Sequence, residues 1–353
     1  MKTPAKLAIA ILLFLSVRLC YADDPWLTLA ERTKTAVASK DYVLAEQLAS
    51  QEMQLFVDKK DNNLNRLVYT LFTLGEIYHI ENKIALAEEN YKKAYEMSKA
   101  QGDNPSISRL LMCGRLGTIL VDDSKFDEAE TTLRSCVNKS PPPSFDKDDF
   151  LARTAFISAL QHQGKLDEAE SMSRDMLQSV QKALPPDSPE IADSLNMLSL
   201  TIQHEKLGIH MMEAENYMRQ AIAICRKTAE ENDLRCAIFE DNLGEQLAGE
   251  EKFDEAEKHI KYALQMRTLK LGENHPYTAS TAYNLGRLYF LQERYEEAVP
   301  ILKKVLANFR TTYGANSTYL EDVQHYLVSS LRKLGKDQEA RRIERENGMW
   351  VVH

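Results

Sequence analysis

Apolar residues along most of the chain recur three and four positions apart, the spacing of helices that bury one face. In the clearest stretch this pattern predicts one helix at 277–291 and a second at 295–309. The second helix opens on a short phrase: an apolar or aromatic residue, one or two acidic residues, then alanine. The phrase therefore marks the start of the second helix in a helical hairpin.

Copies of this phrase hold their phase along the whole chain. Eight copies can be aligned, with successive alanines 42, 42, 40, 45, 42, 42 and 42 residues apart. A fixed period of this size predicts an all-α solenoid, in which each unit buries its apolar face on its neighbours. The anchoring alanines are Ala45, Ala87, Ala129, Ala169, Ala214, Ala256, Ala298 and Ala340.

A small residue precedes most of these alanines at a fixed distance. Gly75, Gly117, Gly244 and Gly286 stand twelve positions before them, and Ser199 takes the place in the copy with an insertion. We expect each glycine to face the alanine and to let the two helices cross closely. Ile157 and Val328 hold this position in two other copies, and those hairpins should be splayed or shifted.

The pattern of Leu-Gly, an aromatic residue, a turn and then Ala resembles the tetratricopeptide repeat. The segments NLGRLYFLQERYEEAVPILKKVL (284–306) and NLGEQLAGEEKFDEAEKHIKYAL (242–264) carry it best. The period and the linker KLGENHPYTAS (270–280) resemble the long repeats of kinesin light chains. The resemblance implies a right-handed superhelix of about eight antiparallel helix pairs over residues 23–347, with a short tail at 348–353.

Two segments depart from this regular spacing. SPPPSFDKDD (140–149) shortens the period to 40, and HEKLGIHMMEAE (204–215) lengthens the next hairpin by three residues. They represent tolerated loop variation, or else a local change in curvature that shapes a pocket.

The first 22 residues have the layout of a secretory signal peptide. Lys2 and Lys6 precede an apolar run at 7–17, and small residues lie before Asp23. An uncleaved anchor, or a lipid anchor through Cys20, is the alternative. We expect an exported protein, periplasmic or secreted, with no membrane span after cleavage.

Charge narrows the range of partners. Without residues 1–22 the chain has 41 Lys+Arg against 53 Asp+Glu, a net charge of −12. This disfavours nucleic acid, whose binding depends on neutralising phosphates, and is typical of a soluble monomer. The C-terminal end is locally basic between Arg332 and Arg345, as expected of cations near the end of a last helix.

Four further cysteines form two pairs, each placed about a predicted turn. Cys113 and Cys136 flank the turn at 122–125, and Cys225 and Cys236 flank the turn at 230–232. Each pair is either a disulfide formed in an oxidising compartment or two buried thiols.

Known catalytic patterns are missing from the sequence. It contains no GxSxG, P-loop, dinucleotide fingerprint, HExxH or CxxC zinc spacing. Paired acids such as Asp127-Glu128 recur with the repeat and are interpreted as helix caps. We therefore expect no enzyme, no cofactor and no metal.

The candidate functional residues come from the tetratricopeptide resemblance, which places the first helix of each pair on a concave groove. Asparagine offers a donor and an acceptor to a peptide backbone, and aromatic residues supply anchors. The expected peptide-binding residues are Tyr69, Phe72, Glu76, Asn196, Gln203, Asp241, Asn242, Glu245, Tyr283, Asn284, Arg287 and Phe290, with His79, Leu200, His325, Ser329 and Arg332 as lesser members.

The leading hypothesis is a protein-interaction scaffold that holds a peptide or partner protein in this groove. The alternative is a structural component of an envelope or secretion assembly, which uses its convex faces or ends.

Overall fold

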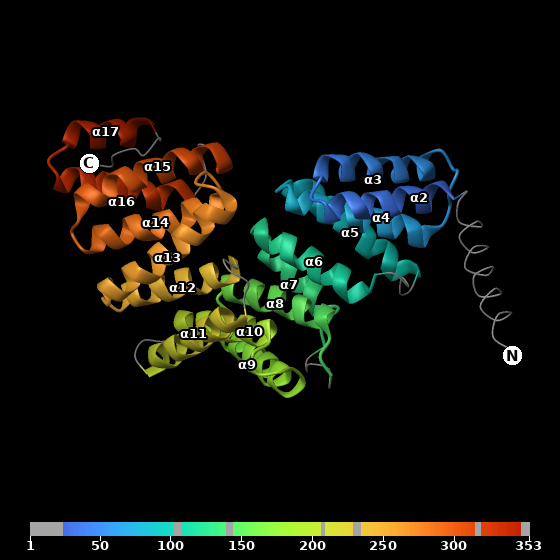
Figure 1. The fold of residues 1–353 in the computed structure, drawn as a ribbon, viewed down its shortest axis with the longest axis horizontal. Helices are drawn as coiled ribbons and strands as arrows, with labels where there is room; N and C mark the ends of the chain where they lie inside the picture. Colours follow the sequence, from blue (N-terminus) through green and yellow to red (C-terminus); the bar gives the residue numbers. More distant parts are fainter. Residues whose placement is uncertain are drawn as a thin grey trace, which may run out of the picture. The chain divides into compact units, whose positions relative to one another are not determined.

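The computed structural model describes residues 24–101, 107–138, 144–205, 209–228, 234–314 and 319–346, and these form helices joined by short turns. Helices pair in chain order, and each pair is an A helix followed by an antiparallel B helix (Figure 1). The fold predicted from the sequence, a solenoid of eight helix pairs, is confirmed over the described residues. The segment at 1–22 that was expected to be a signal peptide and the tail at 348–353 lie outside the described residues.

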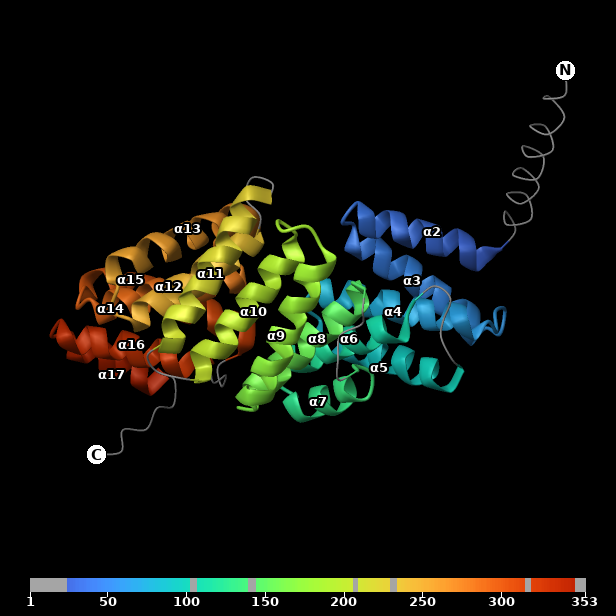
Figure 2. The ribbon, with the colours of Figure 1, turned by 90° about the horizontal axis from the view of Figure 1, so that it is seen from below.

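The chain divides into two compact units, residues 1–176 and 177–353, and the division falls inside α9. In the first unit successive helices lie side by side in both ribbon views (Figures 1 and 2). Its helices are α2 (Pro25–Ala38), α3 (Tyr42–Val57), α4 (Leu64–Ile80), α5 (Ile84–Gln101), α6 (Arg109–Asp122), α7 (Phe126–Arg134), α8 (Lys147–His162) and the first part of α9 (Leu166–Ala183).

The second unit continues the same alternation from the end of α9. Figure 2 shows its helices stacked in order towards the C-terminus. They are α10 (Pro189–Glu205), α11 (Ile209–Thr228), α12 (Leu234–Gly249), α13 (Phe253–Leu271), α14 (Pro276–Leu291), α15 (Tyr295–Tyr313), α16 (Tyr319–Lys333) and α17 (Asp337–Glu346).

The anchoring alanines occupy the tightest places in the fold. All eight are 0% exposed, and each lies near the start of a B helix. The glycines face a different residue from the one expected, however. A Cβ on Gly244 would come within 2.4 Å of Ile260, and one on Gly117 within 2.5 Å of Leu133. Each glycine thus makes room for the residue four positions after the alanine, one turn further along the B helix.

Ser199 fills the glycine position differently. Its hydroxyl donates to the carbonyl of Ala214 at 2.6 Å, so the small polar side chain bonds to the facing backbone. Ile157 and Val328 at the equivalent places are both buried.

Turns between A and B helices share a left-handed residue five positions before the anchoring alanine. Lys40, Asn82, Ser124, Glu251 and Glu293 have φ between 58° and 61°, and Gly164 and Gly335 have 71° and 70°. The next residue donates its N–H back to the A helix, as Lys252 does to Leu247 at 2.9 Å. This closes each A helix in a Schellman-type cap.

A basic residue follows the left-handed one and joins consecutive repeats. Lys83, Lys125, Lys165, Lys252 and Arg294 contact Glu46, Glu88, Glu130, Glu215 and Glu257, which directly follow the preceding alanine. The acids expected as caps do not act as caps: α7 and α13 have no side-chain cap, and Asp127 and Asp254 lie in their first turns near the positive dipole end.

Both departures from the regular spacing alter a B helix. Helix α7 ends at Arg134 after 9 residues, whereas α5 has 18, which accounts for the short period. Asp146 then caps α8 by accepting from the N–H groups of Asp148 and Asp149. In the long hairpin, α11 begins at Ile209, five residues before Ala214 rather than three.

Candidate functional site

Side chains of successive A helices contact one another along the second unit. Asn242 on α12 donates from Nδ2 to Oδ1 of Asn196 on α10 at 2.9 Å. Arg287 on α14 lies 3.3 Å from the carboxylate of Glu245 on α12. Polar contacts therefore connect α10, α12 and α14 in turn.

Aromatic side chains continue this row to α16. The ring of Tyr326 lies 6.1 Å from that of Tyr283 and 5.2 Å from that of Phe290. Phe290 also packs on Tyr295, with ring centroids 5.7 Å apart. We call this set the A-helix face: Asn196, Asn242, Glu245, Tyr283, Arg287, Phe290 and Tyr326.

The A-helix face is partly open to solvent. The side chain of Glu245 is 51% exposed and that of Arg287 is 26% exposed, while the other members are half-buried. Burial raises the pKa of Tyr283, so its hydroxyl stays protonated and can donate a hydrogen bond. A half-exposed ion pair of this kind adds little stability, but it holds both side chains in place.

The two amides on this face keep polar groups for a ligand. Asn196 accepts from Asn242 through Oδ1, which leaves its Nδ2 group as a donor. Asn242 uses Nδ2 in that bond, so its Oδ1 remains as an acceptor. One donor and one acceptor fixed side by side match the N–H and C=O groups of an extended peptide.

Asp241, expected in the groove, lies in the core instead. It is 5% exposed and bonds at 2.9 Å to Arg267 on α13 and at 2.9 Å to the hydroxyl of Thr281 on α14. Asn284 donates to its other oxygen at 3.2 Å. Burial raises the pKa of Asp241, although Arg267 opposes this effect. Asp241 and Asn284 therefore join repeats rather than extend the face.

Residues expected from the first unit mostly contact their own unit. Phe72 is buried and packs on Tyr91, and Tyr69 lies edge-on to Trp26. Glu76 accepts from the hydroxyl of Tyr91 at 2.6 Å and lies 2.9 Å from Arg115. These contacts also connect successive A helices, since Trp26 lies on α2 and Arg115 on α6, and His79 on α4 adds a contact to Asp122 on α6 at 3.3 Å.

Other expected members vary in exposure. Gln203 and Ser329 are half-buried, and His325 is exposed. Arg332 forms an ion pair with Glu344 on α17 at 2.7 Å. Sequence reasoning missed Tyr326, although it stands 42 residues after Asn284 and so shares its register.

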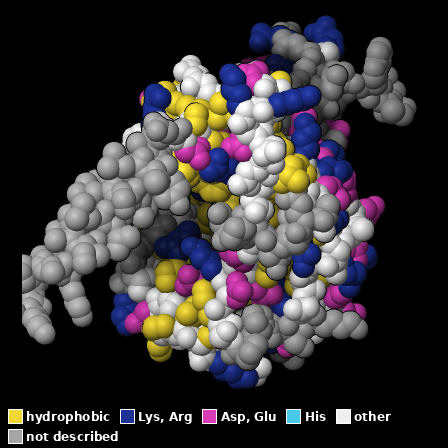
Figure 3. All heavy atoms as spheres, turned by 90° about the vertical axis from the view of Figure 1, so that its right-hand side faces the viewer, with side chains coloured by type: hydrophobic (Ala, Val, Ile, Leu, Met, Phe, Trp, Pro, Cys, Tyr) yellow, Lys and Arg dark blue, Asp and Glu magenta, His cyan; other side chains and the backbone are white. Residues whose placement is uncertain are grey.

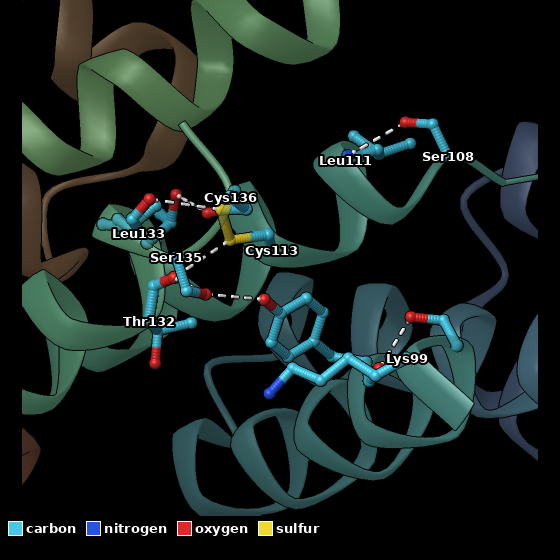
Figure 4. Close-up of a disulfide and its surroundings, with 12 residues drawn as sticks. Lys99, Ser108, Leu111, Cys113, Thr132, Leu133, Ser135 and Cys136 are labelled. Atoms are coloured by element: carbon cyan, nitrogen blue, oxygen red, sulfur yellow. Dashed lines mark hydrogen bonds between the residues drawn. A yellow bond between two sulfur atoms is a disulfide. The ribbon is translucent and has the colours of Figure 1, made fainter. Parts of the chain in front are cut away.

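Disulfides join both cysteine pairs in the structure. Cys113 on α6 bonds to Cys136, just past the end of α7, with Cα atoms 6.7 Å apart (Figure 4). Beside it the hydroxyls of Tyr95 and Ser135 lie 3.0 Å apart. Cys225 on α11 bonds to Cys236 on α12, with Cα atoms 5.7 Å apart. The first bond ties the short helix α7 to its partner, and the second joins two repeats.

Other kinds of site find little support in the described part of the chain. It holds no group of three or more His, Cys, Asp or Glu side chains placed to bind a metal ion. None of its helices is long and apolar enough to cross a membrane. On the face drawn in Figure 3, acidic and basic side chains are interspersed rather than gathered by sign.

Comparison with known proteins identifies the repeats. Family models described as tetratricopeptide repeat match residues 68–101, 158–190 and 233–311. No curated protein matches the sequence.

Solved structures share the fold at low identity. NprR in complex with its cognate peptide NprX has a TM-score of 0.60 and 14% identity, over 97% of this chain and 93% of that one. A Rap protein complexed with competence and sporulation factor has a TM-score of 0.59 and 12% identity, over 92% and 96%. A putative kinesin light chain of Podosopora anserina has a TM-score of 0.49 and 20% identity, over 56% and 92%.

The matched models fall on hairpins α4–α5, α8–α9, α12–α13 and α14–α15, and the buried alanines extend the same repeat to the remaining pairs. The chain therefore contains tetratricopeptide repeats.

Proposed function

We propose that the protein is a non-catalytic scaffold whose A-helix face binds an extended peptide of a partner protein. The observation that carries this proposal is the row of contacts that links α10, α12, α14 and α16. These contacts fix amide, charged and aromatic groups before a ligand arrives, which reduces the entropy lost on binding. Two proteins of the same fold, solved with a peptide or signalling factor, support a peptide as ligand.

Each part of the face has a distinct role in this proposal. Asn196 and Asn242 bond to the peptide backbone without selecting its sequence. Tyr283, Phe290 and Tyr326 contact an apolar side chain of the peptide, and Glu245 with Arg287 lies between these two groups.

We also propose that the protein acts after export. The layout of residues 1–22 and the two disulfides support an oxidising compartment. Mass measurement of the protein purified from its own host should show a chain that begins at Asp23. A full-length chain with free thiols in the cytoplasm would refute this part.

Selection from a displayed library of random peptides tests the peptide site. Selected peptides should crosslink to the A-helix face. The double variant Asn196→Ala with Asn242→Ala should bind them roughly tenfold more weakly, because hydrogen bonds to the peptide backbone are lost. Lys258→Ala on the exposed surface of α13 is the matched control and should bind normally. The proposal fails if the selected peptides bind the double variant as tightly as the parent protein while both melt at the same temperature.

A further inference from the structure

A groove of about 810 Å³ lies between B helices α13 and α15 of the second unit, over the first turns of α14. Leu264 and Thr268 line it from α13, and Ala279 and Ala282 form part of its floor. None of the residues that line it belongs to the A-helix face. Its volume is within the range of ligand-binding sites, about 300–1,000 Å³.

Apolar and neutral polar groups are separated within the groove. Ala279, Ala282, Ile301 and Val305 supply its apolar surface, while the threonines of α13 and α15 lie more exposed. An extended peptide has the same division, because alternate side chains point into a surface and backbone amides run along it.

The two charged residues of the lining neutralise each other. Lys304 lies 2.9 Å from Glu273, and Asn308 donates to the carbonyl of Asn274 at 2.6 Å. Both contacts tie the linker before α14 to α15. The lining therefore has no net charge, which favours an uncharged ligand over an acidic or basic one.

Two buried polar atoms of the lining make no hydrogen bond to the described residues: the hydroxyl oxygen of Thr278 and Oδ1 of Asn308. Thr278 is 2% exposed. An unsatisfied buried polar atom costs stability, and native structures contain few of them. Rotation of Thr278 about χ1 exchanges its hydroxyl and methyl positions, so a ligand could gain this hydroxyl by a change of rotamer.

From these observations we infer a second binding site: the groove between α13 and α15 takes an extended, uncharged peptide segment of a partner protein, with small apolar side chains. Those side chains pack on Ala279, Ala282 and Val305. After the change of rotamer, the hydroxyl of Thr278 donates to a backbone carbonyl of this segment. This site is independent of the proposed A-helix face.

A titration of the full chain, followed by NMR of its alanine and isoleucine methyl groups, tests the inference. The probe is acetyl-Val-Ala-Val-Ala-amide, and its charged counterpart is acetyl-Glu-Ala-Glu-Ala-amide. The neutral peptide should shift Ala279, Ala282 and Ile301 in a saturable way, and the charged one should bind about tenfold more weakly.

Two variants separate binding from folding. Thr278→Val removes an unsatisfied hydroxyl, so it should raise the melting temperature by about 2 °C while weakening the neutral peptide about fivefold. A purely structural role for Thr278 would change stability but leave peptide affinity as it was. Ala282→Leu fills the floor and should abolish binding. Thr118→Val on α6 is the control, because the hydroxyl of Thr118 already donates to the carbonyl of Gly114 at 3.0 Å. This variant should bind the neutral peptide normally and should not have a higher melting temperature.

The inference is overturned if neither peptide shifts the groove methyl groups, if the shifts fall only near Tyr283 and Phe290, or if Thr278→Val binds the neutral peptide normally. Binding of a neutral alkyl glycoside at these methyl groups, without binding of the peptide, would also overturn it and would identify a site for apolar small molecules.

Discussion

Two junctions between repeats, one in each unit, join successive A helices through a buried side chain of the B helix between them. The side chain is acidic in the first unit and basic in the second. In the first unit Glu52 on α3 accepts from Thr33 on α2 at 2.6 Å and from Thr70 on α4 at 2.7 Å. In the second unit Arg267 on α13 contacts Asp241 on α12 and Thr281 on α14. Each B helix thus supplies one buried charged side chain that joins two successive A helices.

The junctions differ in how the buried charge is balanced. Among the described contacts of Glu52 only hydroxyl groups bond to its carboxylate, so burial raises its pKa. Asp241 has the guanidinium of Arg267 beside it. A buried carboxyl group that bonds only to neutral donors should make the stability of its junction depend on pH. A buried ion pair should instead make the stability depend on the presence of both partners.

Loss of the cation should have the largest effect. Arg267→Met leaves Asp241 buried and unpaired, which should cost about 3–5 kcal/mol of stability, because an uncompensated charge in the core retains its desolvation penalty. Urea denaturation monitored by circular dichroism measures the loss.

A second variant separates charge from packing. Arg267→Met with Asp241→Leu removes both charges and should recover most of the stability. If Arg267→Met alone lowers the free energy of unfolding by less than about 1 kcal/mol, burial of Asp241 does not depend on Arg267.

The shared threonine should matter more where no cation is present. Thr70 and Thr281 both stand 17 residues before the next anchoring alanine. Thr70 donates to Glu52 and accepts from the indole of Trp26 at 3.0 Å. Thr70→Val should cost about 2 kcal/mol, since it leaves both groups short of a partner, and Thr281→Val about half as much. Equal losses in urea titrations of the two variants would contradict the comparison.

A smaller effect concerns pH in the first unit. The folded pKa of Glu52 is above its unfolded value of 4.5. Between these values the folded state binds more protons than the unfolded state. The stabilising contribution of the carboxyl group is therefore complete below pH 4.5 and is lost as pH rises through the folded pKa. Glu52→Gln should flatten this dependence.

Trp26 reports on this junction directly, because its indole bonds to Thr70. Its fluorescence in a Trp350→Phe background should follow unfolding of the first unit at several pH values. If Glu52→Gln leaves the slope of melting temperature against pH unchanged, another group is responsible. Glu130 and Glu257, whose pKa is lowered to about 2, do not titrate in the folded protein in this range.

The fold could be predicted from the repeat because the signal of each copy is local and periodic. Ala256 and Ala298 recur in register, and every such alanine proved buried. The sequence could not show which residue faces Gly244, because that depends on the helix crossing. It also carried a lysine or arginine four positions before six of the eight alanines, a usable signal of the ion pairs between repeats.

The candidate site was harder to predict for a physical reason. Positions beside the Leu-Gly pair can point outwards or towards the next A helix, and a shift of one residue turns a side chain by about 100°. Asn242 and Asp241 are neighbours in sequence, yet the first lies on the A-helix face and the second in the core. The buried partners of Asp241, Arg267 and Thr281, are 26 and 40 residues away, so the local pattern does not show them.

The smallest expected effect comes from an ion pair between repeats that lies at the surface. Arg294 contacts Glu257 at 2.6 Å, with side chains 33% and 16% exposed. Burial would raise the pKa of Glu257, but hydrogen bonds from Arg294 and Lys261 lower it to about 2. Its stabilising contribution is therefore complete above pH 4.5 and is lost as pH falls towards 2. Arg294→Met should cost no more than about 1 kcal/mol at neutral pH, and less in high salt. A loss as large as that of Arg267→Met would mean that solvent exposure does not determine how much these ion pairs stabilise the fold. The contrast between the two junctions would then have another cause.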